Sequence, residues 1–91
     1  MYKLSDTVRS THSQDGAIVL DVGHGQMFSI NFVGSRILEF LKSGSTESKL
    51  VDQISNEFSV SRNLAENDVR AFLQKLKNCH LVEEHEPGVA V

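Results

Sequence analysis

Hydrophobic and polar residues alternate along the first third of the chain, as they do in half-buried β-strands. The alternation predicts three strands, at residues 8–13, 17–22 and 26–30. Asp15-Gly16 and Gly23-His24-Gly25 separate them and read as turns. The second strand is the most apolar, with Ile18, Leu20 and Val22 on one face. We therefore expect a three-stranded meander with this strand at its centre and the other two strands at its edges.

From residue 31 onward, apolar residues recur at intervals of three and four, the period of an amphipathic helix. We expect an N-cap at Asn31 for the first helix, and at Ser45 or Thr46 for the second. Asn63, with Glu66 three residues later, resembles a capping box for the third. The apolar stripes of the three helices are Val33, Ile37, Leu38 and Leu41; Leu50, Val51, Ile54 and Phe58; and Val69, Phe72, Leu73 and Leu76.

A run of strands followed by a run of helices predicts an α+β fold. The 91 residues are 40% hydrophobic and 23% charged, which is typical of one folded domain with a thin core. We expect residues 1–91 to form a single domain with its core at about residues 8–82. Residues 83–91, which include the only proline, are expected to form a loose tail.

The net charge, and the lack of segments typical of membrane helices or signal peptides, disfavour several classes of protein. A net charge of -3 disfavours binding to nucleic acid through its phosphates. No apolar run approaches the roughly 18–20 residues that cross a membrane, and the N-terminus has no apolar stretch typical of a signal peptide. Cys79 is the single cysteine and cannot form an internal disulfide. We therefore expect a cytoplasmic protein that has no nucleic-acid or membrane partner.

The polar residues indicate no active site. The histidines are His12, His24, His80 and His85. Neither their spacing nor the neighbouring Cys79 matches a metal-ligand pattern. The Ser and Asp residues show no arrangement that marks a catalytic triad. We therefore expect no metal, no cofactor and no catalysis by this chain.

The third strand is unusual because residues 25–35 contain no charged side chain. Edge strands are commonly protected by charges or proline, and the first strand carries Arg9. An unprotected edge can accept an extended peptide as an additional strand, which is β-augmentation. The alternative is that the fold covers this strand, and that Val69, Phe72 and Leu76 are core residues. The pattern alone leaves both interpretations open.

One flank of the third helix is a suitable wall for such a peptide. This flank mixes acidic, aromatic, basic and small residues, namely Asp68, Phe72, Lys75 and Cys79. A groove between it and the third strand would have an apolar floor and a charged rim, as a short amphipathic peptide requires.

Three runs of sequence resemble the PqqD-like family, the leader-peptide recognition elements of ribosomally synthesised and modified peptides. The runs are VLDVGHGQMFSINFVGSRILEFL, GSTESKLVDQISNEFSVS and ENDVRAFLQKLKNCHLV, and the resemblance spans about residues 8–82. The chain departs from the family in having Ile30-Asn31 where Leu-Asn is usual, and in lacking Trp. The Val33-Gly34 helix start is similar to the stand-alone members of lasso-peptide pathways.

The resemblance implies a winged helix-turn-helix-like fold and a non-catalytic peptide chaperone. It implies that the leader of a precursor peptide adds to the third strand against the third helix. It also implies presentation of that precursor to a modifying enzyme or leader peptidase, in a lasso-peptide or PQQ-like pathway. Carried over by position, the peptide-binding residues are Met27, Phe28, Ser29, Ile30, Asp68, Val69, Phe72, Lys75 and Leu76.

Two other interpretations remain open at this point. A winged-helix DNA-binding regulator would use the third helix for recognition, although Glu66 and Asp68 offset the basic residues there. A homodimer would form if the free edge of the third strand paired with its own copy.

Overall fold

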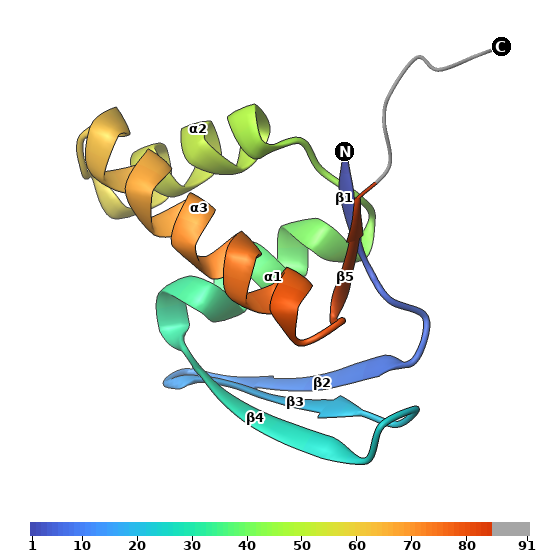
Figure 1. The fold of residues 1–91 in the computed structure, drawn as a ribbon. Coiled ribbons are helices and arrows are strands. Elements are labelled where there is room, and N and C mark those ends of the chain that lie inside the picture. Colours follow the sequence, from blue (N-terminus) through green and yellow to red (C-terminus); the bar gives the residue numbers. More distant parts are fainter. Residues whose placement is uncertain (85–91) are drawn as a thin grey trace, which may run out of the picture.

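The computed structural model describes residues 1–84 and contains eight elements in that range (Figure 1). In chain order they are β1 (Tyr2–Leu4), β2 (Val8–Ser13), β3 (Gly16–Asp21), β4 (Gln26–Asn31), α1 (Phe32–Lys42), α2 (Glu47–Phe58), α3 (Arg62–Asn78) and β5 (Val82–Glu84). Most of the predicted tail, residues 85–91, lies outside the described residues.

Strands β2, β3 and β4 form an antiparallel sheet in that order, with the three helices on one side of it (Figure 1). The predicted α+β class is confirmed, as are the central position of β3 and the edge positions of β2 and β4. Ala17, Val19 and Asp21 face the helices and are buried, whereas Ile18 and Leu20 lie on the opposite, exposed face. The sheet is therefore covered on one face only.

Strands β1 and β5 form a second, two-stranded antiparallel sheet that the sequence did not predict. Glu83 and Glu84 pair with Lys3 and Tyr2, so the boundary predicted for the tail at residue 83 is wrong. Tyr2 also exchanges two backbone hydrogen bonds with Ser45, at 2.6 and 2.9 Å. Three-residue strands at the two ends of a chain are too short to show a period of two, which is why the pattern missed them.

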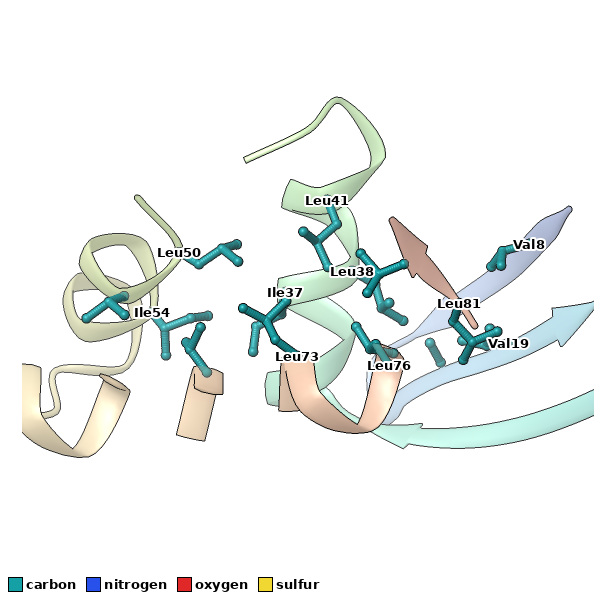
Figure 2. Close-up of a cluster of buried hydrophobic side chains, with 14 of the residues drawn as sticks. Val8, Val19, Ile37, Leu38, Leu41, Leu50, Ile54, Leu73, Leu76 and Leu81 are labelled. Carbon is teal, nitrogen blue, oxygen red and sulfur yellow. The ribbon is translucent and has the colours of Figure 1, made fainter. Parts of the chain in front are cut away.

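The apolar stripes of the helices meet above the sheet and form the core (Figure 2). Its largest fully buried apolar side chains are Ile37, Leu38, Leu41, Leu50, Ile54, Leu76, Leu81, Val19, Val51 and Val69. Three members of the predicted stripes, Val33, Phe58 and Phe72, are only partly buried and pack around this core.

The helix caps follow the predicted chemistry at two of three positions. The side chain of Asn31 accepts a hydrogen bond from the Gly34 amide at 2.8 Å, and Thr46 caps α2. The capping box predicted at Asn63 is wrong, because Ser61 caps α3 and Asn63 lies inside the helix. The left-handed conformation of Ser59 ends α2 in a tight turn, so α3 starts earlier than the sequence indicated.

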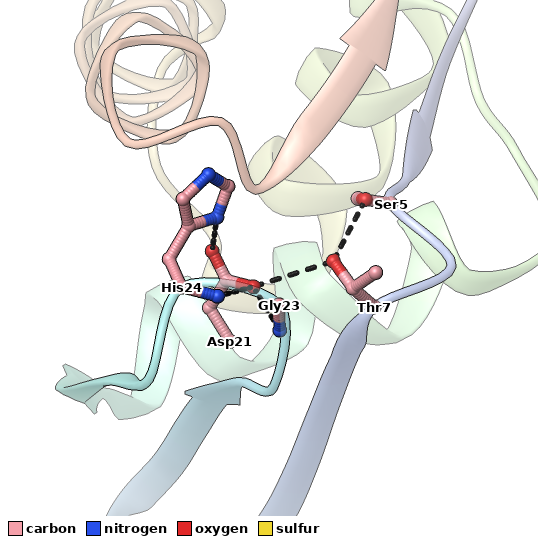
Figure 3. A network of polar contacts seen from close by, with 5 residues as sticks. All are labelled: Ser5, Thr7, Asp21, Gly23 and His24. Carbon is pink, nitrogen blue, oxygen red and sulfur yellow. Dashed lines mark hydrogen bonds and ion pairs between the residues drawn. The ribbon is translucent and has the colours of Figure 1, made fainter.

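The carboxylate of Asp21 is fully buried at the end of β3 and organises the turn into β4 (Figure 3). It accepts hydrogen bonds from the His24 ring at 2.7 Å, from the Thr7 hydroxyl at 3.3 Å, and from two turn amides, those of Gly23 and His24. Burial alone would raise the pKa of Asp21, but the hydrogen bonds from His24 and Thr7 outweigh burial and hold it below its ordinary value. The turn is therefore stabilised by a charged acceptor.

We predict that Asp21→Asn lowers the free energy of unfolding at neutral pH. We also expect this free energy to fall less steeply in the variant than in the wild type as the pH becomes acidic. The folded pKa of Asp21 lies below the ordinary 3.8, so its carboxylate stabilises the fold above that pH and loses the contribution as pH falls below it. Urea unfolding of wild type and Asp21→Asn across the acidic range measures the difference. That difference should shrink below the ordinary pKa.

Asp15→Asn is the matched control for this experiment. Asp15 is exposed in the β2–β3 turn, and within the described chain its carboxylate makes no hydrogen bond or ion pair. Its substitution should leave the acid dependence unchanged. If the free energy of unfolding changed with pH in parallel for wild type and Asp21→Asn, from neutral to strongly acidic pH, stabilisation by the Asp21 carboxylate would be contradicted.

Candidate functional site

A hollow of about 320 Å³ lies between α1 and α3, beside the end of β4. It is lined by Asn31, Val33, Gly34, Ile37, Asp68, Ala71, Phe72 and Lys75. Its floor is apolar, formed by the first turns of α1 and the middle of α3. Its charged residues, Asp68 and Lys75, both belong to α3 and are exposed.

Gly34 sets how closely the walls of this hollow approach each other. A Cβ atom there would lie 2.5 Å from Cγ2 of Ile30 and 3.0 Å from the Phe72 ring. Only glycine leaves room for both side chains, so β4, α1 and α3 meet at this point. The Phe72 ring is thereby held against α1, where it forms part of the floor of the hollow.

The outer edge of β4 is not paired with any strand of the described chain. The carbonyl oxygen of Ile30 points to β3, because a Cβ on Gly16 would collide with it. Backbone N–H and C=O groups alternate in direction along a strand. Those of Met27 and Ser29 therefore face the free edge and are available to another strand.

The structure places seven of the nine predicted site residues in β4 or in the hollow beside the end of that strand. Met27 is 69% exposed and Ser29 is exposed, whereas Phe28 and Ile30 turn their side chains toward the core. Asp68, Phe72 and Lys75 line the hollow next to this edge. The free backbone edge and the helix flank are thus adjacent.

Two of the predicted groove residues are placed elsewhere. Val69 is 0% exposed and Leu76 is 2% exposed, so both are core residues that a bound peptide cannot touch. They occupy the face of α3 opposite to solvent, about one helical position from the flank that lines the hollow. The interpretation of these two side chains as groove contacts is corrected to a role in packing.

The prediction missed the five other residues of the lining, which are Asn31, Val33, Gly34, Ile37 and Ala71. The sequence contained one signal for them. A glycine in a helix is less stable than alanine, so it is expected there only where a neighbouring side chain needs the space. Gly34 could therefore have indicated a close contact, but not the partner in it.

The tertiary structure also assembles a Ser–His–carboxylate chain that the sequence did not reveal. The Ser35 hydroxyl lies 2.7 Å from Nδ1 of His12, and Nε2 of His12 lies 3.3 Å from Glu39. Ser35 is only 3% exposed and does not line the hollow, so a substrate has no access to its oxygen. The contacts connect β2 to α1 and act as structural links.

No group of three or more His, Cys, Asp or Glu side chains in residues 1–84 could hold a metal ion. No helix in the same range has the length and apolar character needed to cross a membrane.

Comparisons with known proteins agree with this geometry. The family model of coenzyme PQQ synthesis protein D (PqqD) matches residues 16–82. A solved structure of TbiB1 in complex with the TbiA(beta) leader peptide has a TM-score of 0.83 and 39% identity, over 92% of this chain and 98% of that one. A lasso peptide synthetase B1 complexed with a leader peptide has a TM-score of 0.78 and 22% identity, over 91% and 98%, which supports the fold alone. The comparison with curated proteins found no match.

We predict that Gly34→Ala destabilises the protein by about 1–3 kcal/mol, because the added methyl group overpacks the junction with Ile30 and Phe72. In an open helix the same substitution would be stabilising. Urea unfolding monitored by circular dichroism measures the change. Gly23→Ala is the control, since a Cβ there meets its nearest neighbours at 3.4–3.5 Å and fits. Unchanged or increased stability of Gly34→Ala would contradict the prediction.

Proposed function

The chain belongs to the PqqD family, and from that membership we propose that it is a non-catalytic protein that binds the leader segment of a precursor peptide. The observation that carries the proposal is the free edge of β4 next to the α3 hollow. The structure of TbiB1, 39% identical to this chain, was solved with a leader peptide, which supports the same class of ligand here.

The leader adds to the sheet as a fourth strand next to β4. The backbone groups of Met27 and Ser29 supply hydrogen bonds that do not depend on the leader's sequence. Because side chains alternate along a strand, every second residue of the leader faces α3 and the hollow. Asp68, Phe72 and Lys75 contact these residues and provide the selectivity.

Binding of the leader presents the attached core peptide to a modifying enzyme or a leader peptidase. The chain contributes by tethering, which raises the effective concentration of the core peptide to about the millimolar range when the tether is short. The Val33-Gly34 start of the first helix, which resembles the stand-alone members of lasso-peptide pathways, favours a lasso-peptide pathway over a PQQ-like one.

The DNA-binding alternative gains no support from the charges of α3. Three of its four basic residues, Arg62, Arg70 and Lys77, form ion pairs with acidic side chains. Only Lys75 is left to contact phosphates, whereas phosphate-driven binding needs several such contacts. A homodimer through β4 would use the same edge as the leader, so the two would compete.

An amide chemical-shift titration tests the proposal. Adding the leader half of the precursor peptide from the protein's own pathway should shift amides in β4 (Gln26–Asn31) and in residues 68–75 of α3. Shifts confined to those segments would locate the site. An absence of shifts with the leader, together with shifts along α3 on adding duplex DNA, would overturn the proposed function.

We predict that Ser29→Pro weakens leader binding about tenfold or more. Proline removes an N–H from the free edge, and its ring occupies the position of the added strand, yet an edge strand tolerates it. Isothermal calorimetry measures the affinity, and circular dichroism verifies the fold. Ser29→Ala keeps the backbone amide and should bind as wild type does. Equal affinity for both variants would show that the edge is not used.

A further inference from the structure

The charged residues of α3 divide into a paired set and an unpaired set. Of its six charged residues, four form ion pairs with other described residues. These pairs are Arg62 with Asp52, Arg70 with Glu47 and Glu66, and Lys77 with Glu84. The other two, Asp68 and Lys75, have no ion pair or hydrogen bond from their side chains within residues 1–84.

An exposed charge is well solvated without a partner, so the lack of an ion pair is informative only together with the position of the residue. Both unpaired residues line the hollow, and none of the paired residues of α3 does. Asp68 and Lys75 are seven positions apart, which corresponds to about 10 Å along a helix. Ala71 and Phe72 lie between them. The hollow therefore has a negative end, an apolar middle and a positive end.

The direction of this pattern relative to β4 follows from two contacts. The His80 ring, just after α3, stacks on His24 in the turn before β4, with ring centroids 6.0 Å apart. Phe72, farther back along α3, lies at Gly34, beyond the end of β4. Helix α3 thus runs antiparallel to β4. A peptide paired antiparallel with β4, as every neighbouring strand in this sheet is, passes Asp68 first and Lys75 second.

We infer that the site selects leader segments by the order of their charges, taking a basic residue, then an apolar residue, then an acidic residue at alternate positions. The inference rests on the proposed function and specifies its ligand. In an extended peptide, residues four apart are separated by about 13 Å and face the same side. That separation matches the spacing of Asp68 and Lys75 once the reach of their side chains is included. The residue between them lies over Phe72.

Two synthetic peptides of identical composition test this inference. One carries Lys-x-Leu-x-Glu and the other carries Glu-x-Leu-x-Lys, with the same Ser and Thr residues at all other positions. Chemical-shift titrations that follow the amides of Ser29, Asp68 and Lys75 give both affinities. We expect the Lys-first peptide to bind about three- to tenfold more tightly, because two attractions replace two repulsions at a partly exposed site.

The charge-exchanged protein Asp68→Lys/Lys75→Glu should prefer the Glu-first peptide by a similar factor. This gain of binding cannot result from misfolding. The control exchange, Asp52→Arg/Arg62→Asp, reverses a single ion pair between α2 and α3 that lies outside the hollow. It should leave the original preference for the Lys-first peptide unchanged.

Several outcomes would overturn charge-order selection. They are equal affinities for the two peptides, an unchanged preference in the exchanged protein, and no binding of either peptide when the protein's own leader binds. In each of these cases, leader-induced shifts in β4 and α3 would leave the proposed function intact. If the protein's own leader also fails to shift those amides, the proposed function itself is wrong.

Discussion

The close approach of three elements at Gly34 is the constraint on which the candidate site depends. Because this residue has no side chain, Ile30 from β4 and Phe72 from α3 both reach the first turn of α1. The contact holds α3 alongside the end of the sheet and leaves the hollow next to it. The outer edge of β4 is unpaired beside it in the described chain, so the backbone edge and the helix flank can act on one ligand.

Other contacts fix the two ends of this arrangement. The buried carboxylate of Asp21 holds the turn that precedes β4, and the His24 ring that it binds stacks on His80 at the end of α3. Strand β1 connects the loop before α2, through Tyr2 and Ser45, to β5 at the end of the described chain. The free strand is therefore supported at its start by a polar network and at its end by tight packing. A strand held in this way can accept a partner with little loss of backbone entropy.

The chemistry of the site separates affinity from selectivity. The backbone edge of β4 offers the same donors and acceptors to any extended peptide. Discrimination must then come from side chains, and the unpaired charges of α3 are suitably placed for it. The remaining charges of this helix form ion pairs with neighbours in the fold, which leaves Asp68 and Lys75 as its two charges without an ion pair within residues 1–84.

Local periodicity was sufficient to predict the three main strands, the three helices, two of the helix caps and the uncharged edge of the sheet. These features depend on residues within one or two turns of each other, so the chain itself encodes them. The family resemblance indicated the flank of α3 that lines the hollow, but its position-by-position use also placed the buried Val69 and Leu76 in the groove. An error of one helical position turns a side chain by about 100° and moves it from the surface to the core.

Only the tertiary structure decided the features that join distant parts of the chain. These are the pairing of β1 with β5, the burial of the Ala17 face of β3 instead of the Ile18 face, and the junction of Gly34 with Phe72. The tertiary structure also decided which charged residues of α3 form ion pairs. In residues 1–84, Arg62 is paired and Asp68 is not, because an acidic side chain of α2 lies within reach of Arg62. Sequence spacing contains no information on such contacts, since they arise only when separate elements pack together.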